Sequence, residues 1–297
     1  MRLPTHVLLV IAAACAPQRR ADVAIAPLVF PFQVDTQRAE QVAPGVIHRF
    51  IYSGTGPWAI HVLDVDRGAC YSAVAVKGFP DSAGRKKTSV MLAELDSTGL
   101  VVGGVNADFF MPDGTPTNAH VSRGAVLTRP NNRPVLAFDS TGAPHILRLR
   151  GTVTGDDTVY ARLLPFHPLE AVGGRPVVAS DSVVVPQVDS GAASFSTSRH
   201  PRTAAGIASG GRRLLLVTVD GRQKPYSDGM TLRELANLML ALGARDAINL
   251  DGGGSTAMVM KTPATRQLTV VNKPSDATGE RAVGNALAVV KGCAATR

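Results

Sequence analysis

The chain has 297 residues with 45% apolar composition, which is enough for one large domain or two small ones. Aromatic residues make up only 5%, while 29 glycines and 20 prolines favour many strands joined by turns. The formal net charge of +8 suits an anionic partner, but no block of five like charges occurs and the densest run is Arg85, Lys86 and Lys87. A solvated basic surface is therefore favoured over a nucleic-acid groove.

The first 44 residues differ from the rest of the chain. Residues 1–14 combine a positive start with an apolar run too short to span a membrane, which predicts a secretory signal peptide. The run ends in A-A-A-C, which is similar to a bacterial lipoprotein box although Ala12 stands where Leu is usual. Lipidation of Cys15 is predicted, with an ordinary signal cleaved nearby as the alternative. Residues 15–44 are rich in Ala, Pro and Gln without a period, which indicates a tether before a domain over 45–297.

From residue 46 the pattern becomes that of regular structure. Alternating apolar and polar residues predict strands at 47–52, 58–65 and 71–76. A helical apolar stripe predicts a helix over 88–97, and a buried strand follows over 100–105.

Short strands are predicted in the middle of the chain. Turn dipeptides divide residues 121–160, where 153–159 is typical of a hairpin, and 173–185 contains a further strand pair. Residues 186–201 are polar and serine-rich, so a mobile loop is expected there.

The last third of the chain contains the clearest helix, over 231–242, with an apolar face closed by Gly243. Thr231 and Glu234 form a predicted capping box at its start. Four strands surround it, over 202–209, 214–222, 267–272 and 285–290.

Two segments 143 residues apart resemble each other, with six identities in 21 positions. Both run from a helix through a glycine and a buried strand to N-x-D, so Asn106 and Asp108 correspond to Asn249 and Asp251. Chance similarity between two helix–strand units is the alternative. If the units are related, the strand ends of an α+β fold can bring all four side chains to one cleft.

The second N-x-D opens the most unusual stretch of the chain. Asp251 ends a short buried strand and is followed by Gly252, Gly253, Gly254, Ser255 and Thr256. Three successive glycines cost conformational entropy, which close approach of a ligand or a nest of N–H groups around an anion would justify. A tight turn, the alternative, needs only one or two glycines. We therefore predict a site here.

Carboxylates at strand ends are the candidate acid–base groups. Asp251 and Asp108 are the first candidates, and Asp220 in V-T-V-D-G-R is a third, with a turn aspartate as its alternative.

Arginines beside turns and strand ends are candidate phosphate ligands, namely Arg202, Arg222 and Arg281. The seven histidines show no metal-ligand spacing, no P-loop is present, and G-G-S-T-A misses the elbow of serine hydrolases at its last position. No metal and no cofactor is therefore predicted.

Three cysteines are present. If Cys15 carries lipid, Cys70 and Cys293 remain as a pair in an oxidising compartment. Each follows an apolar run and a glycine, so a disulfide between them is predicted.

Several motifs together resemble the phosphodiester glycosidase family. They are G-V-N-A-D-F-F, R-T-A-A-G-I, V-D-G-R-Q with S-D-G-M-T-L-R-E-L-A, N-L-D-G-G-G-S-T, and V-N-K-P-S-D with G-E-R-A-V-G-N-A-L. They occur in the family's order, and the resemblance covers about residues 45–292, although N-A-D-F-F replaces the family's N-G-x-F-F at Ala107 and Asp108. The resemblance implies one α+β catalytic domain, a mixed and largely antiparallel twisted sheet with a few helices. It also implies hydrolysis of a sugar–phosphate glycosidic bond, as in the lysosomal uncovering enzyme.

We therefore expect an exported, lipid-anchored enzyme of the bacterial cell envelope that cleaves the sugar C1–O bond of a glycosyl-1-phosphate diester. Asp251 would activate water or stabilise the oxocarbenium ion, while Asn106, Asn249, the three arginines and the 252–256 segment would bind substrate. A strong general acid is less necessary because a phosphate monoester already leaves well.

Two alternatives remain at this stage. One is a non-catalytic protein that binds polysaccharide or takes part in exopolysaccharide assembly. The other is a metal-dependent phosphodiesterase in which Asp108, Asp220 and Asp251 are the ligands. A membrane contact is expected through the lipid anchor, and no nucleic-acid partner is expected.

Overall fold

Three antiparallel sheets organise the chain in the computed structural model, which describes residues 28–149, 152–154, 157–159, 166–262 and 266–293. The predicted signal peptide and Cys15 lie outside these residues.

The first sheet has eight strands in the order β1 (Thr36–Ala43), β2 (Val46–Ser53), β3 (Trp58–Asp66), β17 (Arg213–Val219), β16 (Arg202–Ala208), β18 (Ala244–Asn249), β14 (Val177–Ser180) and β15 (Val183–Val184). The second has the order β20 (Leu268–Val270), β19 (Met258–Lys261), β6 (Val101–Asn106), β22 (Asn285–Lys291) and β4 (Tyr71–Lys77). The third has the order β10 (Pro144–Arg148), β9 (Pro134–Phe138), β13 (Glu170–Gly173), β7 (His120–Ser122) and β8 (Ala125–Thr128). Two short pairs are β11 (Thr152–Thr154) with β12 (Asp157–Val159) and β5 (Lys86–Lys87) with β21 (Ala282–Val283).

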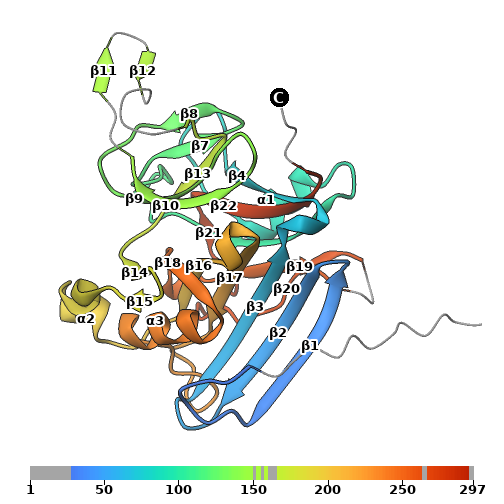
Figure 1. Ribbon diagram of the computed structural model, residues 1–297, viewed down its shortest axis with the longest axis vertical. Coiled ribbons are helices and arrows are strands. Elements are labelled where there is room, and N and C mark those ends of the chain that lie inside the picture. The colour runs from blue at the N-terminus through green and yellow to red at the C-terminus, as the bar shows by residue number, and fades with distance from the viewer. Residues whose placement is uncertain (1–27, 150–151, 155–156, 160–165, 263–265, 294–297) are drawn as a thin grey trace, which may run out of the picture.

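Helices are few, as the sequence predicts. They are α1 (Thr88–Leu95), α2 (Ala193–Ser196) and α3 (Leu232–Ala241), with 3₁₀ turns η1 (Arg67–Ala69), η2 (Pro186–Asp189), η3 (Ser209–Gly211) and η4 (Gly253–Ser255). In Figure 1, α2 and α3 lie together beside β14 and β15, and the third sheet lies at the opposite end of the molecule from β1 and β2.

The main core lies where the inner faces of the three sheets meet. Leu63 on β3, Val105 on β6 and Leu136 on β9 are all completely buried there. The other face of the first sheet packs against the apolar side of α3, and α1 packs on the second sheet through Met91 and Leu92. Burial of these apolar faces is the main force that holds sheets and helices together.

The predicted capping box at α3 is confirmed. The Thr231 hydroxyl accepts a hydrogen bond from the Glu234 N–H at 3.1 Å, and the Glu234 carboxylate accepts one from the Thr231 N–H at 2.9 Å. Two backbone donors that helix geometry leaves without partners are thereby satisfied.

Three expectations about architecture need correction. Every strand pairing among the described residues is antiparallel, so the sheets are not mixed. The predicted tether over 15–44 includes β1, an edge strand that its backbone pairing with β2 holds although its middle residues are exposed. The predicted loop over 186–201 contains η2 and α2.

Cys70 and Cys293 form a disulfide with a Cα–Cα distance of 4.3 Å, which is the pairing that the sequence predicts. The reason lies in the register of the second sheet. β4 starts directly after Cys70, β22 ends two residues before Cys293, and Tyr71 pairs with Lys291. The disulfide therefore closes the end of an existing strand pair.

In the part of the chain that the structure describes, no helix is long and apolar enough to cross a membrane.

Candidate active site

The two N-x-D segments meet, although they leave different sheets. The Asn106 side chain at the end of β6 donates a hydrogen bond to the backbone oxygen of Asp251, at 2.7 Å. The Asp251 N–H in turn donates to the backbone oxygen of Ala107, at 2.8 Å. These two bonds fix the position of Asp251 relative to the second sheet. Burial raises the pKa of Asp108, and the negative charge of Asp251 adds to this rise.

Asp251 lies on a cavity of about 270 Å³ at this junction. The lining residues are Phe109, Ser194, Phe195, His200, Pro201, Arg202, Arg222, Asp251, Gly252, Gly253, Gly254 and Arg281. Among them, Asp251 is the one carboxylate and three residues carry guanidinium groups. The cavity therefore combines one negative group with an excess of positive charge.

Burial raises the pKa of Asp251 to about 6, and Ser255 together with the positive charges of Arg281 and Arg175 opposes this rise. The carboxyl is consequently ionised in most molecules at neutral pH. A half-buried carboxylate that keeps its charge beside cations is suited to stabilising a positive centre or accepting a proton.

The three arginines are held in different ways. Arg281 makes a bidentate ion pair with Asp276, at 2.7 and 3.0 Å. The Arg222 guanidinium donates to Nδ1 of His200 at 3.1 Å. Because Nδ1 accepts, the proton of His200 lies on Nε2, which donates to the backbone oxygen of Ser194 at 2.6 Å.

Arg202 is 2% exposed and bonds to backbone oxygens, that of Met230 at 2.8 Å and that of Phe195 at 2.7 Å. Burial and the neighbouring Arg222 lower its pKa to about 10, so it stays charged at neutral pH. No carboxylate among the described residues forms an ion pair with Arg202 or Arg222. Two guanidinium groups side by side without such a partner favour binding of an anion.

The glycine segment does not form an open anion nest, which is one of the two explanations for its glycines offered by the sequence. Its N–H groups are largely used within the protein, since those of Gly253, Ser255 and Thr256 donate to backbone oxygens at 2.9 to 3.2 Å. Ser255 and Thr256 are buried beneath the cavity.

The glycines are explained by steric limits. A Cβ on Gly254 would collide with Arg281 and Asp276, and Gly253 has a φ of +61° with Arg222 directly above it. The segment therefore lets the arginines approach the floor of the cavity closely.

Asn106 and Asn249 position the site and do not line the cavity. Asn106 is completely buried, and its oxygen accepts hydrogen bonds from Thr203 at 2.8 Å and from the Ala257 N–H at 3.1 Å. Asn249 is 1% exposed and donates to the backbone oxygen of Arg175 at 2.7 Å. The geometry supports a positioning role for both in place of the predicted contact with substrate.

Asp108 is also buried behind the cavity. Its carboxylate accepts hydrogen bonds from the Gly173 N–H at 2.8 Å and from Asn285 at 2.6 Å, and the Asn285 amide also lies 2.8 Å from Nδ1 of His120. Burial raises the pKa of Asp108 to about 7. The predicted shared cleft is thus formed only in part, because Asp251 alone of the four N-x-D side chains lines the cavity.

Asp220 organises a turn and does not line the cavity. Its carboxylate accepts hydrogen bonds from Asn272 at 2.9 Å and Tyr226 at 3.0 Å, and from the Lys273 N–H at 3.0 Å. Burial raises its pKa. The alternative interpretation of Asp220 as a turn aspartate agrees with this geometry.

The proposed metal-ligand set of Asp108, Asp220 and Asp251 is not assembled. Each carboxylate has the separate environment described above. Across the described ranges, no three His, Cys, Asp or Glu side chains are grouped so that they could hold a metal ion.

Other residues of the cavity were not predicted from the sequence. Phe109 belongs to the N-A-D-F-F motif, but its ring gave no separate signal. His200 and Phe195 come from the segment expected to be a mobile loop. Arg175 lies close enough to lower the pKa of Asp251, and its guanidinium stacks on the Phe109 ring at 4.9 Å.

Fold and cavity together define a sheet-rich domain whose cavity combines the Asp251 carboxylate with three guanidinium groups. The family model for phosphodiester glycosidase matches residues 99–290, and the chain belongs to this family. A comparison with curated proteins finds no match.

Solved structures share the fold at low sequence identity. A hypothetical protein from Synechocystis aligns with a TM-score of 0.66 and 16% identity over 86% of this chain, which spans 63% of that protein. A protein from Burkholderia pseudomallei, described as exported, aligns with a TM-score of 0.59 and 22% sequence identity. The alignment covers 80% of this chain and 74% of that protein's chain. The catalytic domain of zebrafish N-acetylglucosamine-1-phosphodiester alpha-N-acetylglucosaminidase aligns with a TM-score of 0.59 and 18% sequence identity. The alignment covers 90% of this chain and 85% of that domain's chain.

Proposed function

We propose that this protein is an exported hydrolase that cleaves the sugar C1–O bond of a glycosyl-1-phosphate diester. The observation that carries the proposal is the pairing of one ionised carboxylate, Asp251, with the guanidinium groups of Arg202, Arg222 and Arg281 on one small cavity. Membership of the phosphodiester glycosidase family supports the same reaction.

The charges fit the change that the substrate undergoes. A phosphodiester carries one negative charge. When the bond to C1 breaks, the bridging oxygen gains additional negative charge. Arginines at the phosphate are therefore attracted more strongly to the transition state than to the substrate, which accelerates the reaction. Among the described residues, no carboxylate forms an ion pair with Arg222 or Arg202, so these two are the first candidates for this contact.

Asp251 is proposed to act at the sugar. As C1–O breaks, the sugar develops positive charge at C1, and a carboxylate beside it stabilises this charge. The phosphate monoester leaves with the electron pair of the broken bond, the oxygen of water bonds to C1, and the proton of that water passes to the Asp251 carboxylate. Export and lipid attachment at Cys15 remain part of the proposal, and Cys15→Ser should move the protein from the membrane fraction to the soluble fraction.

Hydrolysis in ¹⁸O-labelled water tests the reaction directly. Cleavage at C1 places the label on the sugar, whereas a phosphodiesterase would place it on the phosphate. Label on the phosphate would contradict the proposal. A panel of glycosyl phosphodiesters that bind without turnover would instead support the non-catalytic alternative, in which the same cavity only binds a polysaccharide.

A further inference from the structure

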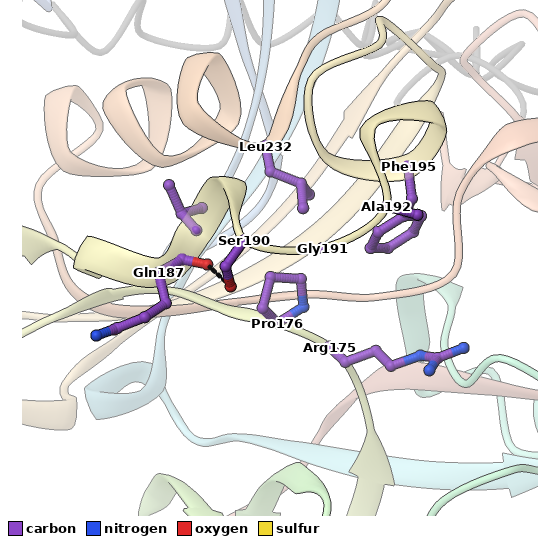
Figure 2. A pocket seen from close by; sticks show the side chains of 9 residues that line it. Arg175, Pro176, Gln187, Ser190, Gly191, Ala192, Phe195 and Leu232 are labelled. Atoms are coloured by element: carbon purple, nitrogen blue, oxygen red, sulfur yellow. Dashed lines mark hydrogen bonds between the residues drawn. The ribbon is translucent and has the colours of Figure 1, made fainter.

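A second cavity of about 480 Å³ lies next to the candidate active site. Pro176, Val188, Ala192, Phe195 and Leu232 supply its apolar walls. Figure 2 shows Arg175 and Phe195 at one end of this cavity and Gln187 at the other.

The two cavities share a wall. Phe195 lines both of them, and its ring meets the Phe109 ring of the first cavity edge to face at 5.9 Å. Arg202, a cation of the first cavity, holds the Phe195 backbone oxygen at 2.7 Å. A ligand whose phosphate lies at Arg202 and Arg222 therefore needs to extend only past Phe195 to reach the second cavity.

Arg175 stands at this boundary. Its backbone is fixed by two hydrogen bonds with Asn249, both at 2.7 Å, while its guanidinium rests on Phe109 and is exposed. It lines the second cavity and its charge reaches Asp251 in the first. A cation in this position complements a phosphate that lies between the two cavities.

The rest of the second cavity offers few polar partners. The Ser190 hydroxyl already donates to the backbone oxygen of Gln187, at 2.7 Å. A second sugar would bring several hydroxyl groups and would leave most of them without partners against Pro176 and Leu232, at a cost in free energy. An alkyl group would instead gain from leaving water.

We infer that the second cavity binds the alcohol portion of the substrate, and that this alcohol is an apolar one. This inference rests on the proposed function, since it places the sugar at Asp251, the phosphate between Arg175 and the other arginines, and the alcohol beyond Phe195. It restricts the substrates to glycosyl phosphodiesters of an apolar alcohol.

Binding of methyl, butyl and hexyl phosphate, measured by calorimetry, tests the inference without any turnover. Each methylene group that enters an apolar site strengthens binding by roughly twofold to fourfold, so hexyl phosphate should bind at least about 30-fold more tightly than methyl phosphate. Ala192→Phe, which fills the cavity from an exposed position, should abolish most of this gain. Ala193→Phe is the matched control, because Ala193 is also exposed and is not part of the cavity wall.

Ser190→Phe fills the cavity from another exposed wall position and should give the same loss, which protects the test against misfolding of one variant. Equal affinities for the three alkyl phosphates would overturn the inference, as would a gain that survives both substitutions. If the affinity for alkyl phosphates does not change with chain length while a methyl-phosphate diester of a sugar is hydrolysed, the assignment of the apolar subsite is wrong and the proposed function stands. If affinity rises with chain length but no diester is hydrolysed, the proposed function fails and the cavity assignment stands.

Discussion

The contact between the two N-x-D segments depends on the side chain of Asn106, and Asn106→Ala removes it. The substitution deletes one donor and one acceptor that together make three hydrogen bonds, to the Asp251 oxygen, Thr203 and the Ala257 N–H. The Asn106 side chain that makes these three bonds is completely buried. Each buried group left without a partner costs about 1–3 kcal/mol, and some relaxation is expected, so we predict a loss of about 3–5 kcal/mol in the free energy of unfolding.

Asn131→Ala is the control for this prediction. Asn131 also makes side-chain hydrogen bonds, to the Thr117 oxygen at 2.6 Å and from the Arg133 N–H at 3.3 Å, but it is exposed and water can replace them. Asn131→Ala should therefore lower the free energy of unfolding by about 1 kcal/mol or less.

Urea unfolding followed by the fluorescence of Trp58, the single tryptophan, measures both variants. A lower midpoint with an unchanged slope reports the loss of stability. An Asn106→Ala midpoint as close to the wild type as that of Asn131→Ala would refute the reasoning, because the three bonds would then contribute no more than exposed ones.

Three further predictions concern titration, the cavity floor and the disulfide. Burial raises the pKa of Glu170 from 4.5 to about 7, so its contribution to stability is present near pH 4 and is lost as pH rises through 7. Between pH 5 and pH 8, the free energy of unfolding of the wild type, measured in urea, should fall by up to roughly 3 kcal/mol relative to that of Glu170→Gln. A difference between the two proteins that does not change with pH would contradict this. Gly254→Ala should displace Arg281 and lower kcat/KM for a glycosyl phosphodiester by about tenfold or more while the melting temperature falls little, whereas unchanged kinetics would show that this contact is unimportant. Replacing Cys70 and Cys293 together by Ser should lower the free energy of unfolding by roughly 5 kcal/mol, because the disulfide joins positions 223 apart in sequence, and equal urea midpoints would argue against it.

Local patterns made much of the fold predictable from the sequence. The helix over 231–242, its capping box and the strands on either side depend on neighbouring residues, and the structure contains all of them. β1 was missed because an edge strand with exposed middle residues shows no apolar alternation. Its hydrogen bonds with β2 involve the backbone, which leaves little trace in the sequence.

The candidate site was predictable only as a region. Asn106 and Asp108 repeat the pattern of Asn249 and Asp251, so both aspartates are acid–base candidates from the sequence, and only the three glycines after Asp251 distinguish the two segments. Their surroundings differ, because Gly173 of the third sheet covers Asp108 while Asp251 faces the open cavity. Which strand end is covered depends on packing between distant segments, and one sequence does not show it. Arg175 was missed for the same reason.

The central claim is that Asp251 is needed for chemistry more than for folding, and Asp251→Asn measures this directly. The change keeps the shape of the side chain and the backbone bonds with Asn106 and Ala107, but it removes the negative charge from the cavity. Turnover of a glycosyl phosphodiester and a melting curve should be recorded for the same variant. We predict a melting temperature close to that of the wild type with kcat lower by roughly a hundredfold or more, since the lost charge acts mainly on the transition state. The wild type should also lose activity as pH falls through about 6, where Asp251 takes up a proton. Near wild-type turnover by Asp251→Asn would contradict the account.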